Sequence, residues 1–194
     1  MAQSRKKAIL EEVEKRRRVN RLISFAAIAL IAVVVVAVIF SLPSRGNAVP
    51  LPGYLDRCVT GTLAYHSHPG LSIVINGSTF PLPSGVGIQG ACNKPIHAHD
   101  ASGTLHVETD DGSRDYTLRD FFLIWGNWEN NPQRAIFNST QIFGGKTVGH
   151  TLTTTVNGSR DNSFQNLVIP RTACSSSDTC QSGFQTFQIL ITYV

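Results

Sequence analysis

Residues Leu22 to Leu42 form one uncharged, strongly apolar segment, LISFAAIALIAVVVVAVIFSL. An α-helix needs about 20 such residues to cross roughly 30 Å of hydrocarbon, and in lipid it satisfies its own backbone hydrogen bonds. The segment therefore predicts a transmembrane helix over 22–42. It exceeds the apolar core of a signal peptide, about 7 to 15 residues, and no clear Ala-x-Ala cleavage site follows it. We expect an uncleaved anchor, with a cleaved signal peptide as the alternative.

Positive charge is concentrated before this segment. Residues 1–21 carry eight Lys and Arg against three Glu, whereas the rest of the chain carries nine against ten acidic residues. The positive-inside rule then predicts a cytoplasmic tail over 1–21, a single pass through the cell membrane, and an extracytoplasmic C-terminal part. Because that part has no basic excess, it is not expected to bind nucleic acid.

The exported part begins with a tether and continues as a β-rich domain. Residues 43–54 are rich in Pro and Gly and predict an extended linker, and the domain is expected over 55–194. Short runs with strand character follow, at 59–66, 71–75, 78–83, 103–109, 134–143, 150–156, 164–170 and 184–194. Asn76-Gly77 and Asn157-Gly158 lie between such runs at hairpin-turn positions. The predicted fold class is mainly β, with antiparallel sheets or a sandwich-like arrangement.

One segment, YTLRDFFLIWG, has helical periodicity instead. Thr117 can cap a helix with Asp120 three residues later, and Gly126 can end it, which predicts a short helix over about 118–125. Its apolar residues at helical spacing form one stripe: Leu118, Phe121, Phe122 and Trp125. We expect this stripe to pack on the sheet as core; the alternative is an aromatic wall beside a binding site.

Four cysteines follow the predicted anchor, in a compartment where disulfides persist. Three connectivities are possible. We favour Cys58 with Cys92 and Cys174 with Cys180, because a local bridge would close the polar loop CSSSDTC. Cys92 as a thiolate metal ligand is the alternative.

Five of the six histidines fall into two clusters, His66-Ser-His68 and PIHAHDASGTLHVE, the latter with His97, His99 and His106. Alternate side chains of a strand share a face, so the members of each His-x-His pair are expected to point the same way. If Asp100 to Gly103 form a hairpin loop, His97 opposes His106 and His99 faces Thr104. Carboxylates are available from Asp100 and Glu108.

The pattern predicts a metal site with the ligands His97, His99, His106, His66, His68, Glu108 and Asp100. A pH-sensitive polar network and plain surface strands are the alternatives. His150 is isolated and expected to be structural. Since imidazole suits copper and zinc and Met1 is the only methionine, a His-rich copper site is expected, with zinc as the alternative.

Three blocks, HSHPGLSIVINGSTFPLPSGVGI, CNKPIHAHDASGTLHVE and RDYTLRDFFLIWG, resemble in their order a family of membrane-anchored or secreted microbial proteins without an established activity. The resemblance spans about Tyr65 to Gly126. It implies an exported β-rich domain and points to the same histidines, with Asp100 and Glu108, as functional positions. The Pro after the second His of HSHPG departs from the family pattern.

The function expected from these features is copper buffering or delivery, or an accessory role in a membrane metalloenzyme complex. A cell-surface interaction domain without metal is the first alternative. The second is a zinc-dependent hydrolase with Glu108 as its base. No compact zinc-protease, Gly-x-Ser-x-Gly or phosphate-loop motif is present, so we expect a binding module and not an enzyme.

Overall fold

The computed structural model describes residues 49–171 and 184–194, together with four helical residues nearer the N-terminus, Arg16, Arg17, Asn20 and Ile31. Apart from Ile31, the predicted anchor at 22–42 lies outside the described residues, as do Cys174 and Cys180. Among the residues that are described, no helix is both long and apolar enough to span a membrane.

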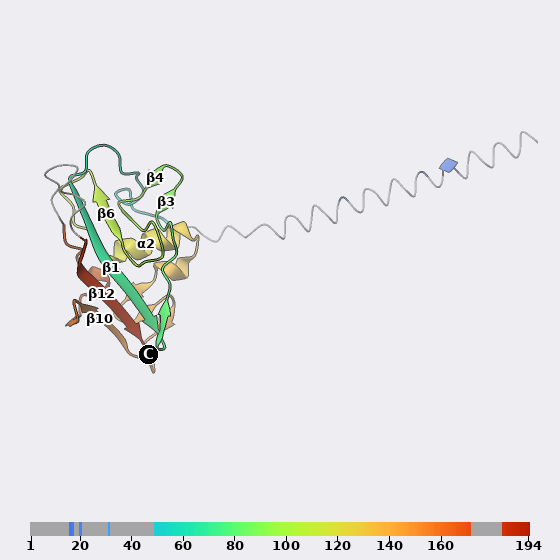
Figure 1. Ribbon diagram of the computed structural model, residues 1–194. Helices are drawn as coiled ribbons and strands as arrows, with labels where there is room; N and C mark the ends of the chain where they lie inside the picture. Colours follow the sequence, from blue (N-terminus) through green and yellow to red (C-terminus); the bar gives the residue numbers. More distant parts are fainter. Residues whose placement is uncertain (1–15, 18–19, 21–30, 32–48, 172–183) are drawn as a thin grey trace, which may run out of the picture. The chain divides into compact units, whose positions relative to one another are not determined.

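The folded unit is mainly β, as predicted, and it is built on a seven-stranded sheet (Figure 1). The strand order is β11-β10-β12-β1-β6-β5, and β2 also pairs with β1. The strands of this sheet are β1 (Tyr65–Ile75), β2 (Ser78–Phe80), β5 (Ile96–His97), β6 (His106–Thr109), β10 (Leu152–Val156), β11 (Ser159–Asp161) and β12 (Phe184–Tyr193).

The long central strand β1 has different neighbours along its two sides. Its first half pairs antiparallel with β6 and its second half antiparallel with β2, while β12 runs parallel to it on the other side. The parallel pair was not predicted, because strands far apart in sequence can meet in either direction and their side-chain alternation is the same in both. Otherwise the strand pairs of this sheet are antiparallel.

Both predicted Asn-Gly hairpins are confirmed. Ile75 pairs with Ser78 across one turn, and Val156 pairs with Ser159 across the other. All four turn residues have positive φ, between 50° and 82°. Two consecutive residues with positive φ match the twist of the flanking strands, and Asn followed by Gly tolerates this conformation best.

The predicted helix is present as α2 (Leu118–Trp128), three residues longer than expected. The Asp120 carboxylate accepts the Thr117 amide at 2.8 Å, which fixes the N-terminus. Gly126 does not end the helix; a Cβ there would lie 2.6 Å from the Cβ of Ala135, so glycine permits close packing against η1 (Pro132–Ala135). The apolar stripe is core, as predicted, since Leu118, Phe121, Phe122 and Trp125 are fully buried.

Smaller elements complete the domain. β3 (Ile88–Gln89) pairs with β4 (Cys92–Asn93), and a three-stranded sheet consists of β7 (Phe137–Asn138), β8 (Gln141–Ile142) and β9 (Gly145–Lys146). The predicted strand at 164–170 is instead a 3₁₀ turn, η2 (Phe164–Asn166), followed by one isolated bridge. Its apolar residues Leu167 and Ile169 are buried without forming a strand.

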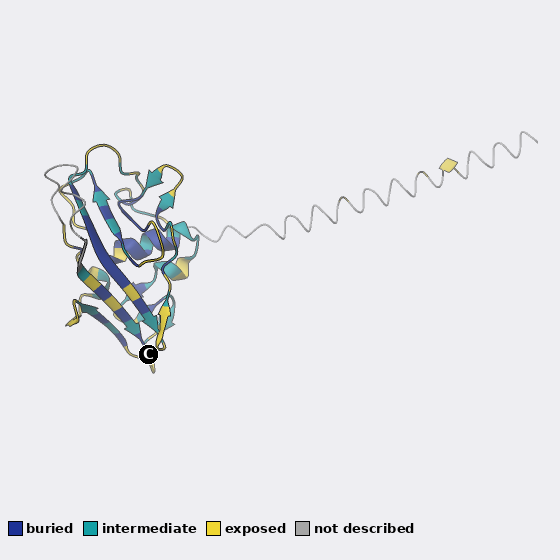
Figure 2. Cartoon of the chain, viewed as in Figure 1, coloured by how far each residue is buried: buried dark blue, intermediate teal, exposed yellow. Residues whose placement is uncertain are grey.

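The core lies between the sheet and α2. The central strand β1 is buried over most of its length, whereas β12 alternates buried and exposed residues (Figure 2). On β12, for example, Ile189, Ile191 and Tyr193 are buried, whereas Gln188 and Leu190 are exposed. The last residues of the predicted tether also lie on this unit. Leu51 and Tyr54 pack against the core, and Asn127 Nδ2 donates to the Val49 carbonyl at 2.7 Å.

Candidate metal centre

The hairpin that carries the second histidine cluster has the predicted register. His97 on β5 pairs with His106 on β6, and Ile96 pairs with Val107. Ile96 and Val107 are buried in the core. Because side chains alternate along a strand, His97 and His106 lie on the opposite face of the sheet from this apolar pair. The predicted pairing of His99 with Thr104 is not made, since β5 ends at His97 and Thr104 bridges to Gly70 instead.

The first histidine cluster comes to the same face through β1. His66 pairs with Glu108 and Ser67 pairs with Val107. Extending this register by one residue sets His68 opposite His106, and their ring centroids are 4.4 Å apart. The result is one row of three imidazoles across β1, β6 and β5, with His66 and Glu108 forming the adjacent row.

Pro69 lies within β1 directly after the histidines, and it does not remove them from the site. The pairing of β1 with β12 shifts register between His68 and Gly70. The Pro69 carbonyl accepts the Leu105 amide at 2.9 Å, and the Leu71 amide donates to the Gly103 carbonyl at 2.8 Å. Gly103 has a φ of +87°, and a Cβ there would lie 2.5 Å from the Leu71 carbonyl oxygen. The hairpin loop is therefore fastened to β1 beside His68, and only glycine fits at this contact.

His97 is held in one orientation by the backbone. Its ring is fully buried and its Nδ1 lies 2.9 Å from the Lys94 carbonyl oxygen. A carbonyl can only accept, so Nδ1 carries the proton and the neutral ring presents the lone pair of Nε2 to the cluster. Metal-binding histidines commonly have this second contact, because it fixes the tautomer and the ring orientation.

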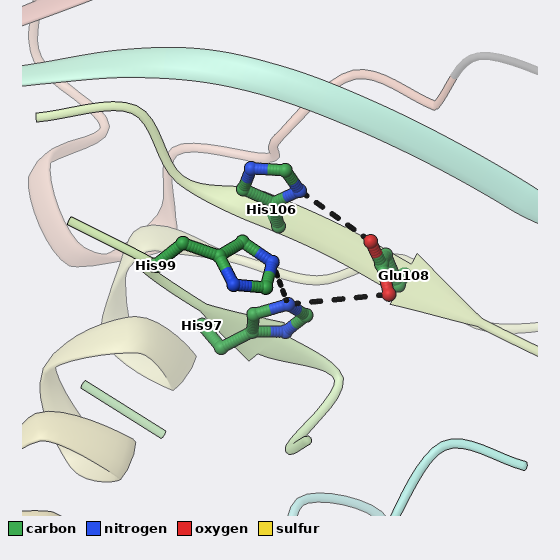
Figure 3. A group of neighbouring side chains, drawn as sticks. All are labelled: His97, His99, His106 and Glu108. Carbon is green, nitrogen blue, oxygen red and sulfur yellow. Dashed lines mark hydrogen bonds and ion pairs between the residues drawn. The ribbon is translucent and has the colours of Figure 1, made fainter. Parts of the chain in front are cut away.

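The possible ligand atoms are closely spaced. His97 Nε2 lies 3.2 Å from His99 Nε2, and Figure 3 shows these two rings facing Glu108 together with His106. On the other side, His66 Nε2 is 3.0 Å from Glu108 Oε1 and 3.4 Å from His106 Nδ1. Two ligands about 2.05 Å from one ion are separated by about 2.9 to 3.4 Å for angles between 90° and tetrahedral. The cluster has the spacing of a coordination shell.

Burial and charge favour neutral imidazoles beside an ionised carboxylate. Burial lowers the pKa of both His68 and His97 to about 4, and burial also lowers the pKa of His66. The hydrogen bond from His106 lowers the pKa of Glu108 to about 2, against the opposing effect of burial. Neutral imidazole and ionised carboxylate are the forms that bind metal, so these four groups need lose no proton at neutral pH.

The cluster therefore contains six of the seven predicted ligands. Two sets have ligand atoms within 4.8 Å of one another: His97, His99, His106 and Glu108, and His66, His68 and His106. Asp100 is not among them; its exposed carboxylate accepts the Ser102 amide at 2.9 Å and so stabilises the hairpin loop. His150 is also separate, stacked on Tyr193 near the far end of β1, with ring centroids 4.9 Å apart.

Cys92 is not a thiolate ligand, because it forms the predicted disulfide with Cys58. Lys94 was not predicted to contribute, and it acts on His97 through its backbone carbonyl. A carbonyl is common to every residue, so no residue type at position 94 could have indicated this role.

Comparison with protein-family models, with curated protein sequences and with solved structures found no match to this chain.

Proposed function

We propose that this protein is a single-pass, membrane-anchored domain that binds copper outside the cytoplasm and buffers it, delivers it, or holds it for a membrane metalloenzyme. The observation that carries the proposal is the convergence of five imidazoles and the Glu108 carboxylate on one face of the sheet at coordination-shell spacing. His97 and His68 are 0% and 4% exposed, which speaks against histidines of plain surface strands.

The donor set supports copper, with zinc as the second candidate. Nitrogen sites bind divalent first-row metals with affinities that rise to Cu²⁺ and fall again at Zn²⁺. No thiolate competes among the described residues, since Cys58 and Cys92 are joined. A disulfide also suits an exported domain, because thiols stay reduced in the cytoplasm.

The hydrolase alternative has less support. A zinc hydrolase needs a general base whose pKa lies near the operating pH. Glu108, the carboxylate within the cluster, has its pKa lowered to about 2 and faces imidazoles on both sides. It is better suited to ligand a metal than to accept a proton.

Metal titration of the full chain tests the proposal. The metal-free protein, purified in detergent, is titrated with Cu²⁺ and separately with Zn²⁺ in a calorimeter. We expect tight binding of Cu²⁺ by the parent and at least a tenfold loss of affinity in His97→Ala, because the variant loses the coordinate bond of a ligand whose orientation the backbone fixes.

His150→Ala is the matched control, since this histidine stacks on Tyr193 outside the cluster and should leave the affinity unchanged. If the parent bound neither metal, the cluster would be a polar network and the interaction domain would be the better account. Equal losses in His97→Ala and His150→Ala would show that binding arises elsewhere.

A further inference from the structure

The cluster offers more ligands than one ion uses. Zinc is held by four ligands in most protein sites, and copper sites of imidazole and carboxylate are commonly tetragonal. Five histidines and Glu108 give six side chains, of which His66, His68 and His97 are largely or fully withdrawn from solvent. Burying three imidazoles costs solvation free energy unless hydrogen bonds or a bound metal compensate for the lost water contacts.

We infer that the cluster binds two ions of the same class, placed on either side of Glu108, an inference that rests on the proposed metal-binding function. One ion is held by His97 and His99 and the other by His66 and His68. His106 lies beside both positions.

The division into two positions follows from distance. Two ligands of a single ion can be at most about 4.1 Å apart, twice a metal–nitrogen bond. The ligand atoms fall into two sets, each with its atoms within 4.8 Å of one another, and His106 is the residue that the sets share. The His106 ring is edge-on to His99 on one side and to His68 on the other, with centroid distances of 4.4 Å in both cases.

The two oxygens of Glu108 face different histidines. Oε1 lies 3.0 Å from His66 Nε2, whereas Oε2 lies 3.9 Å from His97 Nε2. A carboxylate oriented in this way can give one oxygen to each ion. Paired metal sites in proteins hold their ions about 3.5 to 4 Å apart, a separation that one carboxylate spans.

Native mass spectrometry of the full chain with Cu²⁺ counts the ions directly. We expect two ions on the parent, one on His99→Gln, one on His66→Gln, and two on His150→Gln. Electron paramagnetic resonance of the same samples supplies a second measure. Two Cu²⁺ ions sharing a carboxylate couple their spins, so signal intensity per copper should fall as the second ion binds, and each single-ion variant should keep full intensity.

The possible failures are distinguishable. A parent that saturates with one ion would overturn the two-ion inference while leaving the proposed function intact, and a parent that binds none would overturn both. Two ions with undiminished signal would show that Glu108 is not shared. Far-UV circular dichroism of each variant, matched to the parent, ensures that a lost ion reports a lost ligand and not a lost fold.

Discussion

At the scale of single residues, the buried histidines make the metal-free protein sensitive to acid. Burial holds the pKa of His68 and His97 at about 4, whereas an unfolded histidine titrates near 6.5. Between these values the unfolded state binds protons that the folded state does not, so the free energy of unfolding should fall as the pH drops from 6.5 to 4. The loss is on the order of 2–3 kcal/mol per histidine, and stability from this source is complete above pH 6.5.

Urea unfolding with a chelator present, at pH 4.5, 5.5 and 7, measures this pH dependence of the free energy of unfolding. His97→Gln, which cannot gain a proton, should show a clearly shallower pH dependence; an unchanged slope would contradict the role of His97.

At the scale of elements, the segment before β5 positions His97, and the Cys58–Cys92 disulfide fastens that segment. The Val59 amide donates to the Asn93 carbonyl at 2.9 Å, and Lys94 pairs with Asp56 at 2.8 Å. Replacing both Cys58 and Cys92 by Ser should lower the free energy of unfolding by about 2–5 kcal/mol, because the unfolded chain is no longer constrained. Copper affinity should fall by less than in His97→Ala, since every ligand remains while the Lys94 carbonyl is held less firmly. Guanidinium unfolding gives the free energy of unfolding, and calorimetric titration gives the copper affinity.

Lys94→Met is the matched control: it removes the Asp56 ion pair but keeps the carbonyl, and it should leave copper affinity nearly unchanged. A larger effect on copper affinity from Lys94→Met than from the cysteine pair would contradict the assignment.

At the scale of the whole molecule, the topology proposed from the sequence can be tested separately from the metal site. The charge difference across residues 22–42 predicts a cytoplasmic N-terminus and an extracytoplasmic domain. A protease added to intact cells whose outer surface is accessible should therefore remove residues 55–194 and spare a tag placed before Met1. Replacing Lys15, Arg16, Arg17, Arg18 and Arg21 by Gln should reduce the fraction of correctly oriented chains. Loss of the N-terminal tag with protection of the domain would show the opposite orientation.

Several parts of this structure follow from local rules that can be applied to the sequence. An Asn-Gly pair between two strand-like runs specifies a tight hairpin, and both such turns form. The capping pair Thr117 and Asp120 and the apolar stripe specify α2 and its buried face. The turn residues between the two histidine strands predicted the pairing of His97 with His106, which forms, because the connection between two hairpin strands limits their register.

Other parts depend on contacts between distant segments, which no local pattern encodes. Packing of the assembled domain explains three such features. β12 pairs parallel with β1, and residues 164–166 form a 3₁₀ turn in place of a strand. Thr104 bridges to Gly70 and does not pair with His99.

Strand alternation has a period of two whatever the neighbouring strands are, so the sequence was sufficient to predict that His66 and His68 share one face. It could not determine that the two clusters share one site. That was decided when β1 docked against β6, which brought His66 and His68 beside His106 and Glu108. Strand pairing between distant segments is determined by the burial of their apolar side chains, here Tyr65 and Val107. The histidines on the opposite face come together because these apolar side chains are buried on the same side.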